Sequence, residues 1–247
     1  MIKEFKNGKL NNCDSLIKTL GLHEIEKPVV AFIGGGGKTT TMKRLVKEYN
    51  KKGVPVIVTT TTHLFNENEP WFLLEPSMEK ALDIIEKYKV VWIGSLTDKG
   101  KMAMPDKEFL DKMINLGYPV LIEADGARRL PCKAPGENEP VYISQVNSVV
   151  NVYGIDSIGK KIEETCFRPE NVAGILGKDL KDIVTEEDVV VLATDKRAGK
   201  KDIDINMDYH VIINKVDNDV QVNQAGKICT YSDKRGLCDI IITGNRK

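Results

Sequence analysis

Residues Val29-Val-Ala-Phe-Ile-Gly-Gly-Gly-Gly-Lys-Thr-Thr40 carry the clearest structural signal in this chain. The run begins with five apolar residues, which is typical of a strand buried on both faces of a sheet. Four glycines follow, and the Lys-Thr-Thr segment after them opens a predicted helix. A strand, a glycine loop and a helix in this order favour phosphate binding, so we predict a nucleotide-binding α/β protein.

Each residue type in this segment has a chemical reason to be there. Glycines allow backbone N–H groups to approach phosphate oxygens closely. Lys38 supplies a cation for the β and γ phosphates, and Thr39 supplies a hydroxyl for Mg²⁺. We expect the nucleotide-binding residues of the loop to be Gly34, Gly35, Gly36, Gly37, Lys38, Thr39 and Thr40.

The segment departs from the common G-x-x-x-x-G-K-[ST] pattern, because Phe32 occupies the place of the first glycine. Two interpretations are open. Either Phe32 and Ile33 form the first turn of a full-length loop, or the strand runs to Ile33 and the loop is a shorter G-x-x-G-K-T. The shorter form resembles the ATP loop of Mur ligases, and G-G-x-G-K-T-T also resembles deviant Walker loops, although their signature lysine would fall at Ile33.

The rest of the chain alternates apolar runs with amphipathic segments, which is typical of an α/β fold. We predict a P-loop NTPase-like three-layer sandwich, in which helices cover both faces of a mostly parallel sheet. The predicted strands are Val29 to Ile33, Val54 to Thr59, Val90 to Ile93, Val120 to Ala124, Ser148 to Tyr153, Tyr209 to Ile213 and Asp239 to Thr243. Predicted helices follow Thr40 and cover Ser77 to Tyr88, Pro105 to Leu116, Pro169 to Leu176 and Thr185 to Leu192.

We expect residues 1–247 to form one such domain. The region from about 126 to 201 is rich in proline, glycine and charge, so it forms either a small lobe or long loops over the sheet. The 36 basic and 36 acidic residues balance, and we therefore expect neither a nucleic-acid nor a membrane partner. The amino-terminal segment lacks an apolar targeting run, so we expect a cytoplasmic location. Five cysteines without a C-x-x-C pair indicate neither a disulfide framework nor a zinc site.

Ligands of open α/β sheets bind at the carboxyl ends of the strands, and two carboxylates stand at such an end here. Glu123 and Asp125 follow the apolar run Val120-Leu-Ile and point the same way in a regular strand. Either one can bind Mg²⁺, which prefers hard oxygen ligands. We therefore assign Mg²⁺ to Thr39 with Glu123 or Asp125, and we name Lys38, Glu123, Asp125 and Arg128 as catalytic candidates.

Two polar segments nearby are candidates for holding a second ligand. The run Thr59-Thr-Thr-Thr-His63 ends a predicted strand, and Thr61, Thr62 and His63 could contact phosphate or a metal-bound water. The alternative is that threonine simply favours strands and His63 caps the turn. The second segment contains Arg128, Arg129 and Lys133, which could stabilise charge in transfer or hold a second anionic ligand. The alternative is a solvated basic turn.

A base-reading motif is predicted at Asn214-Lys-Val-Asp217, which follows an apolar strand. In GTPases, the aspartate of N-K-x-D accepts hydrogen bonds from guanine N1-H and N2-H₂, while the lysine stem packs along the ring. Adenine offers no such donor pair, so binding of adenine would leave the buried carboxylate without hydrogen-bond partners. Asn214, Lys215 and Asp217 therefore favour GTP over ATP.

Taken together, these motifs resemble the selenium-dependent hydroxylase accessory proteins, also called YqeC-like. The resemblance is carried by Ile33-Gly-Gly-Gly-Gly-Lys-Thr-Thr, Val58-Thr-Thr-Thr-Thr-His63, Ile122-Glu-Ala-Asp-Gly-Ala-Arg128, Leu130-Pro-Cys-Lys-Ala-Pro135, Glu139-Pro140, Arg168-Pro-Glu170 and Ile213-Asn-Lys-Val-Asp217. It implies a nucleotide-binding fold and assistance in maturing selenium-dependent molybdenum hydroxylases. Relatives usually carry an apolar residue in place of Cys132, which argues against a catalytic thiol.

The sequence leads to one main functional hypothesis and two alternatives. The main hypothesis is an NTPase that binds Mg²⁺ with GTP, or ATP, and acts on a molybdenum hydroxylase or its cofactor. The first alternative is a phosphoryl or nucleotidyl transferase, or a ligase, with a pterin-like or nucleotide-like acceptor. The second is a chaperone that changes conformation on binding nucleotide without hydrolysing it.

Overall fold

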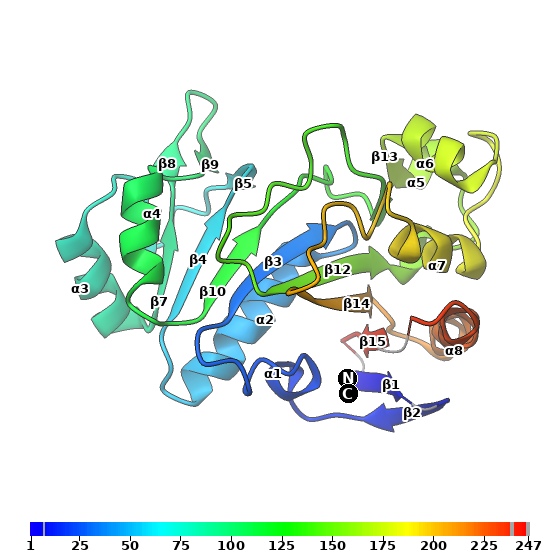
Figure 1. Cartoon of the computed structure of the whole chain (residues 1–247), viewed down its shortest axis with the longest axis horizontal. Coiled ribbons are helices and arrows are strands. Elements are labelled where there is room, and N and C mark those ends of the chain that lie inside the picture. The colour runs from blue at the N-terminus through cyan, green and yellow to red at the C-terminus, as the bar shows by residue number, and fades with distance from the viewer. Residues whose placement is uncertain (7, 238–239, 246–247) are drawn as a thin grey trace.

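The computed structural model describes residues 1–6, 8–237 and 240–245 of the chain. A ten-stranded sheet forms its centre (Figure 1). In spatial order the strands are β2 (Lys9–Asn12), β1 (Ile2–Lys6), β15 (Ile240–Thr243), β14 (Asp208–Asn214), β12 (Ser148–Gly154), β3 (Val29–Gly34), β10 (Val120–Glu123), β4 (Val56–Thr60), β7 (Val90–Ile93) and β6 (Phe72–Leu73).

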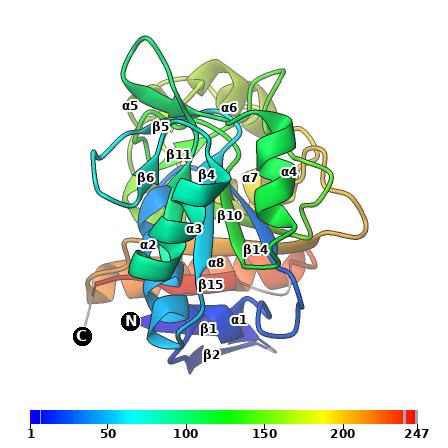
Figure 2. The same ribbon diagram turned by 90° about the vertical axis from the view of Figure 1, so that its left-hand side faces the viewer.

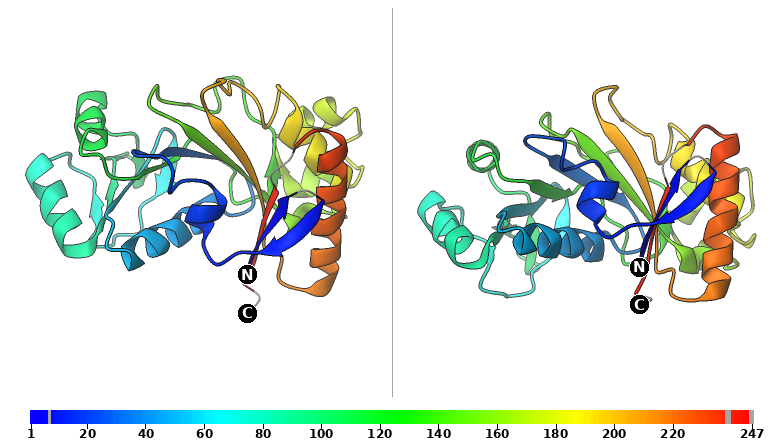
Figure 3. Two further views of the ribbon diagram at one scale, coloured as in Figure 1. Left: turned by 60° about the horizontal axis from the view of Figure 1, so that its bottom comes forward. Right: turned by 90° about the horizontal axis from the view of Figure 1, so that it is seen from below.

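Every pair of neighbours from β15 to β6 is parallel, and only the edge strands β1 and β2 are antiparallel. All seven predicted strands are present with ends that differ by at most two residues, although Asp239 lies outside the described residues. The amino-terminal hairpin was not predicted. Figure 3 shows this hairpin, in dark blue, beside the red strand β15, where the Met1 amino group donates to Gly244 O at 3.0 Å.

Alternate residues of the central strand β3 enter two different cores, because successive side chains in a strand point to opposite faces. Val30 and Phe32 pack in the core that contains Met42 and Leu45. Val29, Ala31 and Ile33 belong to the core on the other face, with Ile85 and Leu110. Burial on both faces explains why the strand reads as a continuous apolar run.

Helices cover these two faces and complete three layers. They are α1 (Leu16–Thr19), α2 (Lys38–Lys51), α3 (Met78–Tyr88), α4 (Lys107–Ile114), α5 (Ile162–Thr165), α6 (Pro169–Leu176), α7 (Glu186–Thr194) and α8 (Asp219–Lys234). Figure 2 shows α2 on one side of β4 and β10 and α4 on the other. The fold is therefore the mostly parallel α/β sandwich that the sequence predicted, and none of the helices formed by the described residues is long and apolar enough to cross a membrane.

Residues 126–201 contribute β12 to the main sheet and also build a separate cluster beside it. The cluster contains α5, α6, α7 and the two-stranded sheet of β11 (Cys132–Lys133) and β13 (Cys166–Phe167). Its apolar residues share one core with β14, β15 and α8, so the segment is packed onto the sheet. A three-stranded sheet of β5 (His63–Phe65), β9 (Lys101–Ala103) and β8 (Ser95–Leu96) lies beyond the carboxyl end of β4 (Figure 1).

Cysteine adds no covalent link to the described part of the chain. Cys13, Cys132, Cys166 and Cys229 are free thiols, and Cys238 lies outside the described residues. Cys132 and Cys166 are paired residues of β11 and β13, both buried. The hydrogen bond between them, together with burial, raises the pKa of the Cys132 thiol well above its ordinary value, so this thiol is poorly suited to nucleophilic chemistry.

Candidate functional site

The glycine loop, Gly34 to Gly37, lies at the carboxyl end of β3 and leads directly into α2. β3 pairs with β10 on one side and with β12 on the other, so the loop sits where the chain order changes direction across the sheet. In open α/β sheets this switch point is where ligands bind. Phe32 and Ile33 belong to the strand, and of the two loop interpretations the shorter one is therefore correct.

Close packing explains why this loop is built from glycine. Gly34, Gly36 and Gly37 have φ of 89°, 70° and 117°, a region that other residues rarely adopt. A Cβ on Gly36 would also lie 2.6 Å from Gly154 Cα. Gly36 N donates to Leu130 O at 3.0 Å, and this bond ties the loop to the segment that carries the basic residues 128 and 129.

Lys38 is held inside the loop by two oxygens. Its Nζ lies 2.6 Å from Gly34 O and 2.9 Å from Asp125 Oδ1, and the residue is 5% exposed. Burial alone would lower the pKa of Lys38, but Asp125 and Glu123 outweigh it and raise the pKa above its ordinary value. The ammonium group is therefore charged, and Gly34 O and Asp125 hold it beside the loop.

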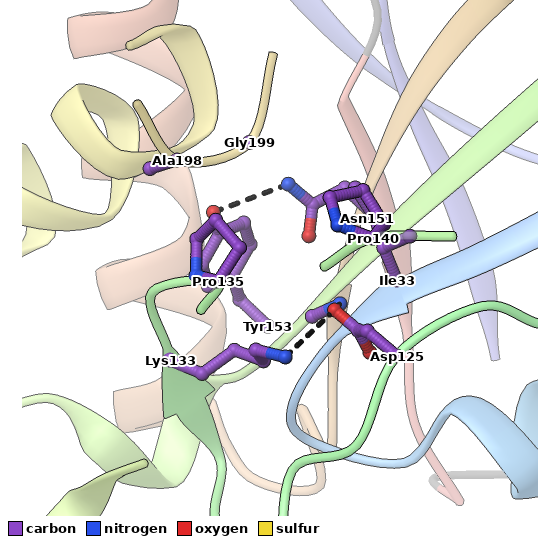
Figure 4. A pocket seen from close by; sticks show the side chains of 10 residues that line it. Ile33, Asp125, Lys133, Pro135, Pro140, Asn151, Tyr153, Ala198 and Gly199 are labelled. Atoms are coloured by element: carbon purple, nitrogen blue, oxygen red, sulfur yellow. Dashed lines mark hydrogen bonds and ion pairs between the residues drawn. The ribbon is translucent and has the colours of Figure 1, made fainter. Parts of the chain in front are cut away.

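Asp125 is the centre of a buried ionic network behind the loop. Its Oδ2 accepts from Gly34 N at 2.9 Å and lies 3.0 Å from Lys133 Nζ (Figure 4). Lys133 also contacts Glu139, and Glu139 in turn pairs with Arg168, both at 2.7 Å. Burial would raise the pKa of Glu139, but the hydrogen bonds from Arg168 and Lys133 lower it to about 2. Lys133, predicted as a contact for a second ligand, is thus already paired with the carboxylates of Asp125 and Glu139.

Glu123 takes a different position from Asp125, although the two were equal candidates for the metal. The Thr39 hydroxyl donates to Glu123 Oε2 at 2.8 Å, which joins the first turn of α2 to the end of β10. Burial raises the pKa of Glu123, partly offset by Lys38 and by the Thr39 bond. Thr39 and Glu123 both line a cavity of about 550 Å³, whereas Asp125 does not line it.

The predicted base-reading motif is connected to the glycine loop by Asn214. Its Nδ2 donates to Gly36 O at 2.8 Å, and its Oδ1 accepts from the Thr243 hydroxyl at 2.8 Å. Asp217 is exposed, and its Oδ1 accepts from Asn245 N at 2.6 Å. The last residue of β15, Thr243, and Asn245 just after it thus support the two ends of the motif, a role that the sequence did not reveal.

Lys215 lies at the motif's other flank. It has φ of 65° and lines the 550 Å³ cavity, where its Nζ is 2.9 Å from Asp156 Oδ2. Asn214 instead lines a second cavity of about 410 Å³, bordered by the basic face of α2. The two neighbouring residues therefore open onto different cavities.

The threonine run after β4 divides in the same way. Thr61 donates to Val141 O at 2.7 Å and holds a neighbouring loop, so its hydroxyl is occupied. Thr62 and His63 line the 550 Å³ cavity. This cavity is also lined by Arg129, from the predicted basic segment, and by three residues that no motif predicted: Phe65, Lys101 and Phe167.

No group of three or more His, Cys, Asp or Glu side chains within the described residues is arranged to hold a metal ion alone. The oxygens of Thr39 and Glu123 nevertheless fit Mg²⁺, which usually takes one or two protein oxygens and completes its shell with water and substrate phosphates. The site can thus accept a metal that arrives with a phosphorylated ligand.

Comparison with known proteins identifies relatives of this chain. The family model described as YqeC protein matches residues 30–170, a range that contains the glycine loop, both carboxylates and the basic segment. The chain is also 28% identical over 181 residues to the uncharacterized protein YqeC of Escherichia coli strain K12, with 71% of each chain covered.

Proposed function

The chain belongs to the YqeC protein family, and we propose that it binds and hydrolyses a Mg²⁺-nucleotide, with GTP preferred, at the glycine loop. The observation that carries this proposal is that Lys38, Thr39 and Glu123 line one cavity together with the glycine loop. Lys38 carries a charged ammonium, and the Thr39 hydroxyl donates to Glu123 at 2.8 Å. A cation for the phosphates and two oxygens for the metal are among the parts that recur in sites of phosphoryl transfer.

The first turn of α2 supports phosphate binding. Its N-cap is Gly37, which makes no side-chain capping bond. The N–H groups at the start of a helix need acceptors, and phosphate oxygens provide them together with a favourable interaction with the helix dipole. Thr40, at the third position of α2, lines the cavity as well.

Mg²⁺ would be held by the Thr39 hydroxyl and Glu123, where it would neutralise charge on the phosphates. We assign Asp125 a different role, because its carboxylate is used by Gly34, Lys38 and Lys133. When a phosphate replaces Asp125 as a partner of Lys38, Lys133 keeps the Asp125 charge compensated. Lys38 can then move without leaving a buried carboxylate unpaired.

The preference for GTP rests on Asp217 and on the coupling of its motif to the loop. Asn214 connects the motif to Gly36 O, and Asn245 fixes the Asp217 carboxylate. Oδ1 can accept a second bond, and no residue in the described part of the chain donates to Oδ2, so the carboxylate can take the two N–H donors of guanine. A competition assay between GTP and ATP on wild type and Asp217→Asn tests this part. We expect the variant to lose the GTP preference, and an ATP preference in wild type would refute it.

The resemblance of the motifs to selenium-dependent hydroxylase accessory proteins supports the biological role. We propose that nucleotide turnover is coupled to maturation of a molybdenum hydroxylase or its cofactor. Release of inorganic phosphate from Mg²⁺-GTP, measured with and without such a hydroxylase, tests this coupling. Acceleration by the partner is expected, and an unchanged rate would argue against it.

A further inference from the structure

The residues that line the 550 Å³ cavity fall into two groups of different chemistry, which we call its inner half and its outer half. The inner half contains the glycine loop, Lys38, Thr39 and Glu123. The outer half is formed by segments that are far apart in sequence: the end of β5, the start of β9, the turn at residues 128–129 and the end of β13. Figure 1 shows β5 beyond the carboxyl end of β4, and β13 above the carboxyl end of β12.

Three cationic side chains line the outer half: Lys101, Arg128 and Arg129. Within residues 1–6, 8–237 and 240–245, no carboxylate forms an ion pair with any of them. The two acidic residues that do line this half are already used, since Glu67 pairs with Lys43 and Glu139 with Lys133 and Arg168. The outer half therefore has an excess of positive charge that the protein does not neutralise.

Two phenylalanine rings hold these cations in place. The Arg129 guanidinium lies 4.6 Å and Lys101 Nζ 5.5 Å from the centre of the Phe65 ring. Arg128 lies 5.1 Å from the ring centre of Phe167. Contacts of this kind restrict long side chains that would otherwise be mobile, so less entropy is lost when an anion binds. Phe65 itself is 55% exposed and can also contact an apolar part of a ligand.

The backbone of the basic turn is adapted to this arrangement. Arg128 and Arg129 have φ of 47° and 63°, in the left-handed region that costs non-glycine residues about 1 kcal/mol or more. Leu130, the next residue, accepts the hydrogen bond from Gly36 N. Strained residues beside a ligand loop indicate function more often than stability.

We propose that the outer half is the binding site for a second ligand, a small molecule that carries a dianionic phosphate group and an apolar or flat ring. This inference rests on the proposed function, because it assigns the inner half to the nucleotide. The phosphate is bound by Arg128, Arg129 and Lys101, and the ring contacts Phe65. Thr62 and His63, which line the same half, provide further hydrogen-bonding groups.

Calorimetric titration of phenyl phosphate tests this site in two arms, one with nucleotide-free protein and one with protein saturated with Mg²⁺ and guanosine 5′-(β,γ-imido)triphosphate. The analogue fills the inner half and blocks phosphate binding there. We expect phenyl phosphate to bind the saturated protein more tightly than inorganic phosphate does. Arg129→Ala and Lys101→Ala should each lower the affinity for phenyl phosphate roughly 10-fold or more, since each removes a charged contact.

The control is Lys99→Ala, on the same hairpin as Lys101 but absent from the cavity lining. This variant should bind phenyl phosphate like wild type. If saturated wild type binds no phenyl phosphate, or if all three variants bind it equally, the second site is refuted while nucleotide binding stands. If Arg129→Ala instead weakens only the nucleotide analogue, its guanidinium serves the nucleotide's own phosphates and the second site is again refuted.

Failure of the proposed function gives a different result. Wild type would then show no affinity for the nucleotide analogue in any titration. Phenyl phosphate binding to nucleotide-free protein that still depends on Arg129 would support the outer site alone. Thermal denaturation of each variant separates a lost contact from a lost fold, and we expect an unchanged midpoint because none of these side chains is buried.

Discussion

Substitution of Asp125 by asparagine should destabilise the protein strongly, although it changes the side chain very little in shape. Asp125 is 2% exposed, and its oxygens lie 2.9 Å from Lys38 Nζ and 3.0 Å from Lys133 Nζ. The variant keeps both ammonium groups buried and removes the charge between them. Breaking a buried ion pair from one side costs about 3–5 kcal/mol, and because Glu123 and Glu139 remain nearby we take the lower end, about 3 kcal/mol.

The assay is urea denaturation at neutral pH, followed by circular dichroism and accompanied by a thermal melt. For a chain of 247 residues, each kcal/mol of lost unfolding free energy lowers the melting temperature by about 2–4 °C. Asp125→Asn should therefore lower it by about 6–12 °C. Asp195→Asn is the control. The ion pair of Asp195 with Arg197 lies at the surface, so its loss should lower the free energy of unfolding by less than about 1 kcal/mol.

A double variant separates charge balance from any other effect of the asparagine. Asp125→Asn combined with Lys133→Met removes one cation together with the anion, so part of the lost stability should return. Mg²⁺-nucleotide should also stabilise Asp125→Asn more than wild type, since phosphates supply the charge that Lys38 has lost. An Asp125→Asn variant within about 1 kcal/mol of wild type would show that the network is not electrostatically coupled and would refute this reasoning.

Three further predictions concern the loop, the metal and the pH dependence. Gly36→Ala should reduce nucleotide affinity at least 10-fold, because the new Cβ would collide with the end of β12. The control is Gly53→Ala, which has nearly the same φ but open space around it and should leave the affinity unchanged in the same titration. Thr39→Val should abolish the Mg²⁺ dependence of nucleotide affinity while some metal-independent binding remains; a full Mg²⁺ effect would remove this hydroxyl from the metal site. Glu139 has a pKa lowered from 4.5 to about 2, so the stability it contributes is present above about pH 4.5 and disappears as the pH falls toward 2. Glu139→Gln should therefore lower the free energy of unfolding by roughly 1–2 kcal/mol at neutral pH, after allowance for solvent screening. The stability of this variant should also depend less on pH in the acid range. Glu137→Gln, the control, should follow wild type in acid titrations.

The sequence predicted the parts of the fold that have continuous apolar character. The seven predicted strands, which include β3, are buried over most or all of their length, and burial of this kind leaves a clear apolar run in the sequence. The edge strand β2 is exposed along its whole length, and its Lys-Leu-Asn-Asn sequence has no apolar run. Helix α8 was also missed, because it buries mostly small or polar residues and carries Gly226 in its interior.

The candidate site shows the same limit at the level of side chains. Lys38, Thr39 and Glu123 were predicted because each belongs to a short motif next to a strand. The sequence left Glu123 and Asp125 equivalent, since they lie two residues apart, and only the positions of Thr39 and Lys133 distinguish them. No local pattern could pair Phe65 with Lys101, which meet only because β5 and β9 align.

The most direct measurement is calorimetric titration of wild-type protein with a non-hydrolysable GTP analogue and its ATP counterpart, each with Mg²⁺ and with EDTA. We predict binding of the GTP analogue that is strengthened by Mg²⁺, weaker binding of the ATP analogue, and loss of the metal effect in Thr39→Val. If folded wild-type protein binds neither analogue in the presence of Mg²⁺, the glycine loop is not a nucleotide site and the proposed function is wrong.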